Sequence, residues 1–426
     1  MSDDVRARVL HEVEDLTDAM VAELQRVVRI PSISGTADEN SAQAHMASLF
    51  SAGGLDIDHW QIDLDDMQGR DDFPGMEVRR DEAWGLVARL PGTGSDDGAS
   101  LMLNGHIDVV PQGDREAWTD DPFSGTIRGD DLMGRGTCDM KAGLIAAHWA
   151  VQAIRRAGVR LRGDVLLASV QGEEDGGLGT YALLDRGWRA DACVIPEPTD
   201  LDLVPGNAGA LTFRLRVRGH ATHASRRTAG VSAIEKFWPV WQALVELEAR
   251  RHRDVDPARA KFGLTHPLSI GTVHAGDWAS SVPDLLVAEG RLGVALGEPV
   301  ADARLDLERA VAEANQRDPW LRDHPVEVEW WGGQFASGQL AAQSDLLQRV
   351  GSAHAIASSA RAQDTWIAPY GSDLRLLTGI GGIPTLQYGP GDVRLAHGPD
   401  ESVPIGDVVV TARALAVLAL DVCGVA

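Results

Sequence analysis

The sequence predicts an α/β protein in which a mixed, mostly parallel sheet is flanked by helices and a smaller α+β domain is inserted. Two observations lead to this prediction. Between residues 84 and 195, short apolar runs alternate with helical periodicity, which is typical of a parallel sheet covered on both faces. From residue 211 the order becomes strand-helix-strand-strand-helix-strand, the ferredoxin-like split arrangement. A chain of 426 residues is long enough for two cores.

The larger domain is expected to comprise residues 1–208 and 336–426. Its helices are predicted from apolar residues that recur every three or four positions, at 6–29, 38–53, 144–157, a stretch ending at 186, and 339–356. Its strands are predicted at 59–62, 84–90, 101–103, 164–170, 192–195 and 385–388, and residues 408–422 should return to this sheet. The acidic segment 63–72 is interpreted as a solvated loop.

The inserted satellite domain is expected to comprise residues 209–335. Alternating apolar and polar residues predict its strands, at 211–219, 268–274, 285–296 and 326–331. Helical periodicity predicts its two helices, at 231–251 and 301–316.

Composition limits the partners and the compartment. The formal charge of −24 argues against nucleic acid or an anionic membrane surface as a partner. Only 3 cysteines are present, widely spaced, so no disulfide framework is implied and a reducing compartment is expected. The N-terminal residues lack the pattern of a secretory signal, and no apolar run reaches membrane-spanning length. We therefore expect a cytoplasmic protein.

The segment LMLNGHIDVVP, residues 101–111, contains the first candidate for chemistry. An apolar strand leads into a loop that presents His106 and Asp108. Residues two apart on extended backbone project to the same face. Asp108 can therefore accept a hydrogen bond from one nitrogen of His106, which leaves the other nitrogen for a metal.

Further candidates follow later strands, where parallel sheets collect their sites. A pair of divalent metals needs about two terminal ligands each and one bridging carboxylate. The sequence offers such a set in His106, Asp139, Glu174, Glu197 and His397. Nitrogen and carboxylate ligands suit zinc, with cobalt or manganese as alternatives. Because the consecutive side chains of Glu173 and Glu174 diverge, one of them can bind metal while the other faces the substrate.

Nine motifs in order resemble a known family. They are GHIDVVP, WTDDPFSG, GRGTCDMKAG, GEEDGG, IPEPT, GHATHAS, SSVPD, YGSD and AHGPDESVP. The chain resembles the acetylornithine deacetylase, succinyl-diaminopimelate desuccinylase and aminoacylase family of co-catalytic zinc hydrolases, from IPSISG to the C-terminus. The resemblance implies a zinc-exopeptidase-like catalytic domain with a dimerisation, or lid, domain inserted in it.

The resemblance also implies roles for the candidate residues. One metal would be held by His106, Asp139 and Glu197, and the other by Asp139, Glu174 and His397. Asp139 would bridge both metals and be followed by a cis peptide, Asp108 would orient His106, and Glu173 would be the general base.

The satellite domain and two loops match further positions of the family. His223 matches an oxyanion donor that reaches the active site of the partner subunit in a homodimer. Residues matching a substrate-side loop and an acyl-pocket loop are Gly371, Ser372, Asp373, Arg375 and Gly389. Arg375 or a satellite residue is expected to bind a substrate carboxylate through a forked contact. Ser280 stands where many relatives have Asn, which puts a second amide contact in doubt.

We therefore expect a metal-dependent amidohydrolase that removes an acetyl, succinyl or formyl group from an N-acylated amino acid or related small amine. A dipeptidase or other metallo-exopeptidase of the same family is the alternative. A phosphate-binding loop at GRGTCDMK is disfavoured, because Met140 precedes Lys141 and Ala142 follows it, so the sequence lacks G-x-x-x-x-G-K-[ST].

Overall fold

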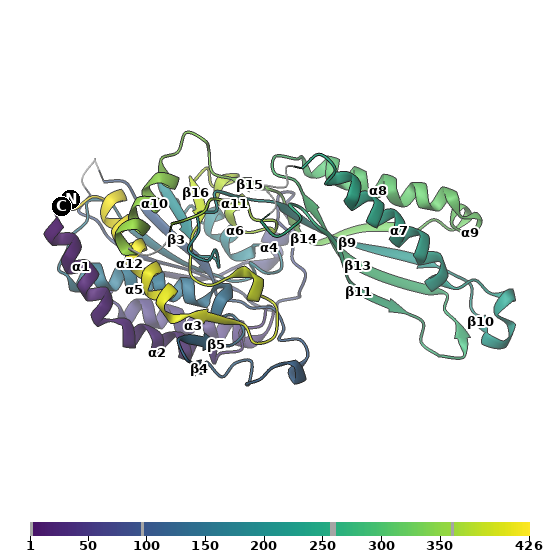
Figure 1. Ribbon diagram of the computed structural model, residues 1–426, viewed down its shortest axis with the longest axis horizontal. Coiled ribbons are helices and arrows are strands. Elements are labelled where there is room, and N and C mark those ends of the chain that lie inside the picture. Colours follow the sequence, from purple (N-terminus) through teal and green to yellow (C-terminus); the bar gives the residue numbers. More distant parts are fainter. Residues whose placement is uncertain (1–2, 95–97, 256–260, 359–361) are drawn as a thin grey trace. The chain divides into compact units, whose positions relative to one another are not determined.

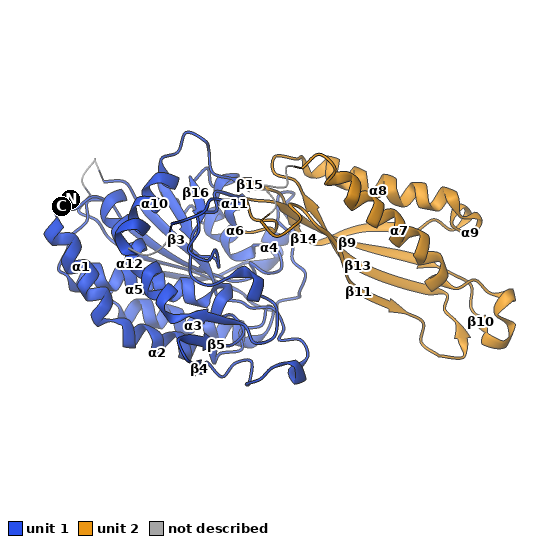
Figure 2. Cartoon of the chain, in the orientation of Figure 1, with its two compact units in different colours: residues 1–206, 339–366, 373–426 blue, residues 207–338, 367–372 orange. Residues whose placement is uncertain are grey.

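The chain folds into two compact units (Figure 2). The computed structural model describes residues 3–94, 98–255, 261–358 and 362–426. The larger unit contains Met1–Gly206, Gln339–Trp366 and Asp373–Ala426, and the smaller contains Asn207–Gly338 and Ile367–Ser372. Compared with the ranges expected from sequence, the smaller unit also includes residues 207–208, 336–338 and 367–372.

The larger unit is organised around a six-stranded sheet with the order β1-β2-β6-β3-β7-β16. Its strands are β1 (Asp56–Gln61), β2 (Trp84–Leu90), β3 (Leu101–His106), β6 (Val165–Val170), β7 (Ala192–Ile195) and β16 (Thr385–Gln387). The pairings among β6, β3, β7 and β16 are parallel, and those of β1 with β2 and of β2 with β6 are antiparallel. The predicted mixed, mostly parallel sheet is therefore confirmed.

Helices cover both faces of this sheet (Figure 1). The apolar core on the first face includes side chains of α1 (Asp3–Asp15), α2 (Thr17–Val28), α3 (Ala37–Ala52), α5 (Ala142–Arg156), α10 (Leu346–Ala357) and α12 (Ile405–Val422). The second face packs against α4 (Leu64–Gln68), α6 (Leu178–Asp185) and α11 (Leu374–Thr378). Alternate strand residues serve the two cores, as Leu101 and Leu103 face the first and Met102 the second.

A small second sheet consists of β4 (Ile127–Arg128), β5 (Asp131–Met133) and β17 (Ser402–Pro404). Two further short strands, β8 (Gly206–Asn207) and β15 (Gly338–Gln339), mark where the chain passes between units. In the described part of the chain, no helix is both long and apolar enough to cross a lipid bilayer.

Three predicted elements differ from the structure. The helix expected over 6–29 is divided at Leu16 into α1 and α2, although Leu16 keeps right-handed helical dihedral angles and main-chain hydrogen bonds to Glu12 and Met20. The acidic segment contains α4, because the Asp63 carboxylate caps it by accepting from the Asp66 amide. The helix expected from residue 339 begins only at Leu346.

The smaller unit has the predicted ferredoxin-like order. Its antiparallel sheet, in the order β11-β13-β9-β14, contains β9 (Gly209–Arg218), β11 (Leu268–Ala275), β13 (Leu285–Val294) and β14 (Glu327–Phe335). The helices α7 (Ala233–Arg251) and α8 (Val300–Arg317) share one apolar core with this sheet, and α9 (Pro319–Asp323) follows α8. A two-residue ladder joins β10 (Thr222–His223) to β12 (Ser281–Val282).

The buried imidazole of His148 in α5 should make the protein sensitive to acid. Burial, and then the nearby charge of Arg155, lower the pKa of His148 to about 3. A histidine in the unfolded chain has a pKa of about 6.5. Below that pH the unfolded state binds a proton that the folded state does not bind. The free energy of unfolding therefore decreases as the pH falls. Between pH 7.5 and pH 5 the urea midpoint of the wild type should fall further than that of His148→Gln, by the equivalent of about 2 kcal/mol.

The matched control is His11→Gln, at an exposed position of α1. This variant should follow the wild type at both pH values. Equal pH dependence of the wild type and His148→Gln would show that His148 is not the acid-sensitive group.

Candidate metal centre

Three neighbouring parallel strands bring the first candidate ligands to one edge of the sheet. His106 is the last residue of β3, Glu173 and Glu174 follow the end of β6, and Glu197 follows the end of β7. All residues of these strands are buried, so their apolar side chains fix the strands and leave the polar residues at the exits. The edge therefore collects an imidazole and three carboxyl groups.

Asp139 lies in the short irregular turn η2 (Thr137–Lys141) that precedes α5, and the peptide bond after it is cis, as the resemblance implied. Its Oδ1 is 3.1 Å from Nε2 of His106, and its Oδ2 is 3.5 Å from Nε2 of His397. The two oxygens of one carboxylate thus face two different histidines. A carboxylate that bridges two metals needs this arrangement.

Glu174 and His397 complete the cluster. Nε2 of His397 lies 3.1 Å from Oε2 of Glu174. Single ligand atoms of His106, Asp139 and Glu174 all lie within 4.8 Å of one another. His397 has a φ of 61°, a left-handed conformation that residues with a side chain rarely adopt, so its direction is set by the surrounding loop.

The acids of this cluster lie where burial opposes their charge. Burial, with the charges of neighbouring carboxylates, raises the pKa of Glu173 well above its usual value, although the charge of His106 opposes this. Burial and the charge of Asp139 raise the pKa of Glu197. The charge of Glu174 raises the pKa of His397 to about 11. The buried carboxylates therefore favour a positively charged group in their midst.

This donor set fits divalent metals. Imidazole nitrogens and carboxylate oxygens are ligands that zinc, cobalt and manganese accept. Nδ1 of His106 lies 2.9 Å from the carbonyl oxygen of Asp108, which directs Nε2 toward Asp139. The negative charge of several buried carboxylates is better neutralised by divalent cations than by single protons.

The carboxylate of Asp108 has a different role from the expected one. It lies 3.7 Å from Nδ1 of His106, too far for a hydrogen bond, and the main-chain carbonyl of Asp108 makes that contact instead. Its oxygens accept from the amides of Glu173 (3.2 Å) and Glu174 (3.3 Å) and from the hydroxyl of Ser34 (2.9 Å). Asp108 thus orients His106 through its backbone and the two glutamates through its side chain.

Two residues expected to face the substrate are buried and make hydrogen bonds inside the fold. Arg375 is only 6% exposed, and its Nη2 donates to the carbonyl of Gly176 at 2.7 Å. Asp373 is buried and accepts from the hydroxyl of Thr180 at 2.6 Å. This guanidinium therefore has a main-chain partner inside the fold, and its forked contact with a substrate carboxylate stays a prediction. A satellite residue remains the alternative.

The other predicted substrate positions lie in packed loops. Gly371 and Ser372 belong to the smaller unit, where the Ser372 hydroxyl is 3.3 Å from Oδ1 of Asn207. Gly389 belongs to the larger unit, and a Cβ there would lie 2.4 Å from the carbonyl oxygen of Pro196. Gly389 thus allows its loop to pack on the chain that leads to Glu197.

His223 is an exposed residue of the smaller unit, at the end of β10. Its Nδ1 accepts from the amide of Ser225 at 3.2 Å. The Ser280 carbonyl accepts from the Ala224 amide and so holds the same turn.

The sequence reasoning missed a set of buried supporting residues. The carboxylate of Glu401 accepts from the amides of Cys138 and Asp139, and Arg135 pairs with it at 2.6 Å. Glu401 lies within the recognised motif AHGPDESVP, so its position was available as a signal. Arg80 had no such signal, because it lies in no motif and its partners are distant in sequence.

A sheet edge that gathers His, Asp and Glu side chains suited to divalent metals around a buried glutamate is typical of metal-dependent hydrolases. Residues 102–421 match the peptidase family M20/M25/M40. The chain belongs to this family, as its nine motifs indicated, and it is a hydrolase that acts on amide bonds.

Individual relatives agree with this assignment. The chain is 28% identical to N-formyl-4-amino-5-aminomethyl-2-methylpyrimidine deformylase of Halalkalibacterium halodurans, over 97% of each chain. It is 31% identical to succinyl-diaminopimelate desuccinylase of Polynucleobacter necessarius, over 76% of this chain and 82% of the relative. Human carnosine dipeptidase 1 has a TM-score of 0.75 at 16% identity, with 98% of this chain and 99% of that chain covered. The last similarity shows the shared fold alone.

Close packing at Gly143 should be needed for the centre. A Cβ on Gly143 would lie 1.8 Å from the carbonyl oxygen of Pro196, so α5 rests directly on the chain before Glu197. Gly143→Ala should lower the free energy of unfolding by about 1–3 kcal/mol, because the two segments must separate. It should also weaken metal binding in chelator competition, since Asp139 and Glu197 flank this contact.

Gly406→Ala in α12 is the matched control, because nothing lies within 4 Å of a Cβ there. It should stabilise the protein by about 0.4–1 kcal/mol and leave metal affinity unchanged. Wild-type stability and metal binding in Gly143→Ala would contradict the close contact.

Proposed function

We propose that the protein is a deacylase that hydrolyses the acyl group, acetyl, succinyl or formyl, of a small N-acylated amine, with two divalent metals in the larger unit. Zinc is the first choice, with cobalt or manganese as alternatives. The observation that carries the proposal is the carboxylate of Asp139, whose two oxygens face His106 and His397. The formyl-pyrimidine relative supports an N-acyl substrate, because it matches nearly the whole chain.

The ligands are divided as the family resemblance implies. One metal would be held by His106 and Glu197, and the other would be held by Glu174 and His397. Asp139 would bind both metals. When bound, the metals would supply Lewis acidity that activates water and polarises the amide carbonyl.

Glu173 is proposed as the group that moves the proton. Its amide is fixed by Asp108, and its side chain is buried beside His106 and Glu197. Burial raises the pKa of Glu173, which moves it toward the range in which a carboxyl group can both accept and return a proton. Glu173 would take a proton from the attacking water and give it to the leaving amine.

His223 is proposed as the oxyanion donor. Because Nδ1 accepts a main-chain N–H, the neutral ring carries its proton on Nε2, as a donor to a developing oxyanion requires. We propose that it acts in the partner subunit's site, so that the smaller unit is the lid and dimerisation domain.

The surface of the smaller unit supports a homodimer. Strand β11 pairs only with β13 and leaves one edge free among the described strands. Apolar side chains of α7 line up on one exposed face at Ile234, Trp238 and Val245, and Trp238 is 63% exposed. An open strand edge beside an exposed apolar stripe suits a two-fold interface.

The proposed function is tested with a substrate panel. It contains the N-formyl aminomethylpyrimidine and N-succinyl-diaminopimelate named for the relatives, simple N-acetyl amino acids, and dipeptides. The wild type should release amine from at least one N-acyl substrate, lose activity with chelator and regain it with zinc, cobalt or manganese. Hydrolysis of dipeptides alone would instead support the metallo-exopeptidase alternative.

Glu173→Gln should keep close to two metals per chain and lose turnover by at least about a hundredfold, because an amide of the same shape cannot accept the proton. Glu174→Gln is the matched comparison and should lower the metal content. Metal analysis and single-turnover assays separate the two effects. Near-normal turnover of Glu173→Gln, or loss of both metals, would contradict the division into base and ligand.

A mixing experiment tests the proposed role of His223 in the partner subunit. Glu173→Ala and His223→Ala should each be nearly inactive as homodimers. After random exchange, half of the dimers carry both variants, and each of these has one intact site. Activity should therefore return to roughly a quarter of the wild type. Inactive mixtures, with exchange shown by differently tagged chains, would place His223 in its own subunit's site or outside catalysis.

A further inference from the structure

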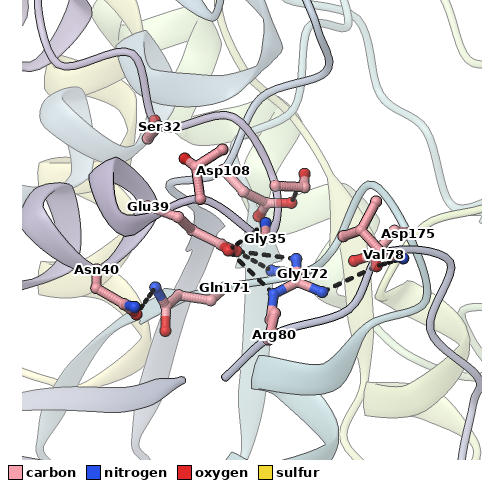
Figure 3. Close-up of polar contacts among 12 residues, drawn as sticks. Ser32, Gly35, Glu39, Asn40, Val78, Arg80, Asp108, Gln171, Gly172 and Asp175 are labelled. Atoms are coloured by element: carbon pink, nitrogen blue, oxygen red, sulfur yellow. Dashed lines mark hydrogen bonds and ion pairs between the residues drawn. The ribbon is translucent and has the colours of Figure 1, made fainter. Parts of the chain in front are cut away.

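A buried ion cluster of Glu39, Arg80 and Asp175 lies beside the candidate centre (Figure 3). Asp175 belongs to the motif GEEDGG, but the mechanism gives no role to it or to the other two residues. Arg80 donates through Nε and Nη2 to both oxygens of Glu39, each at 3.0 Å, and through Nη1 to Oδ2 of Asp175 at 2.8 Å. The three side chains are 1%, 1% and 5% exposed, respectively. A buried cluster of this kind costs desolvation free energy, so a contribution beyond stability is worth seeking.

The remaining bonds of the two carboxylates lead to main-chain amides. Glu39 accepts from Gly35 at 2.7 Å and from Gly172 at 3.1 Å. Asp175 accepts from the amides of Glu77 and Val78 at 3.1 and 3.0 Å. Figure 3 shows that Arg80 lies between these carboxylates. The cluster therefore joins three separate segments of the chain at the loop that follows β6.

That loop, Gly172–Gly176, is the segment that carries Glu173 and Glu174. Its first residue is held by Glu39, and its fourth, Asp175, is held by Arg80. The amides of the two glutamates are held by Asp108, and the carbonyl of Gly176 accepts from Arg375. A Cβ on Gly176 would lie 1.9 Å from the carbonyl oxygen of Gly75. Each loop residue thus has a contact that resists displacement.

Arg80 is the residue that joins the two ends of this loop. Its planar guanidinium binds Glu39, which holds the residue before Glu173, and also Asp175, which follows Glu174. A shift of either glutamate would break part of the fork. Lysine carries the same charge as a single ammonium and cannot make the forked contact.

We propose that Arg80, with Glu39 and Asp175, is a positioning residue that fixes the direction of Glu173 and Glu174 at the metal centre. The inference rests on the proposed deacylase function, because it assigns these glutamates to base and ligand. Groups that orient metal ligands from behind commonly affect metal affinity or activity by 10–100-fold. A displacement of about 1 Å at a reacting group can cost about a hundredfold in rate.

Two variants test the proposal in the full-length protein. Arg80→Lys retains a cation beside both carboxylates and removes only the fork. The triple variant Arg80→Met/Glu39→Gln/Asp175→Asn removes all three charges together, which avoids leaving an unpaired buried charge. Both variants should lower kcat by about 10–100-fold with KM changed by less than about threefold. Both should also weaken zinc binding by about 10–100-fold in chelator competition.

Arg251→Met is the matched control. Arg251, whose side chain is 7% exposed, makes a forked contact with Glu298 at 2.8 and 2.6 Å, in the smaller unit and outside the loop. Its loss should lower the unfolding midpoint and leave kcat and zinc affinity unchanged. A purely structural Arg80 would give the same pattern as this control.

The proposal would be overturned if either variant folded and kept the kcat and the zinc affinity of the wild type. If Arg80→Lys does not fold, the triple variant alone decides the outcome. A wild type that hydrolyses nothing in the substrate panel would defeat the proposed function. Chelator competition would still decide whether Arg80 positions Glu174, so the two failures can be told apart.

Discussion

The larger unit depends on one constraint: several carboxylates must stay buried together where three parallel strands end. An unpaired buried charge costs several kcal/mol, so each acid needs a partner. The structure meets this need with main-chain amides more than with side chains. Asp108, Glu39 and Glu401 each accept from the amides of the loops that carry the candidate ligands. Arg80 and Arg135 then neutralise two of these buried acids.

This arrangement lets each buried acid do two things. It satisfies amides that a strand exit would otherwise leave without partners, and it fixes the direction of the side chains on the same loop. Glycine residues also help to fix the ligand loops, because the absence of a side chain lets two backbone segments approach closely. Gly143 and Gly389 both lie close to the carbonyl oxygen of Pro196, the residue before Glu197. Two segments distant in sequence can therefore rest against the chain that carries this ligand.

Buried hydrogen bonds also hold two residues of a motif that was expected to line the substrate side. Asp373 and Arg375 lie in a motif that was expected to face the substrate, yet they hold Thr180 and the carbonyl of Gly176. Each of these side chains is thus tied to the fold by a buried hydrogen bond.

The sequence by itself determined the strands, their mostly parallel order and the residues at their exits, because apolar runs and ordered motifs are local signals. His106, Glu173 and Glu197 follow from those signals alone. Only the tertiary structure decided that the backbone of Asp108 orients His106 while its carboxylate holds the glutamates. It also brought Arg80 to its two partners, Glu39 and Asp175, which lie 41 and 95 positions away. Such contacts are fixed by the packing of separate segments, and no periodicity or spacing along the chain encodes the direction of a buried hydrogen bond.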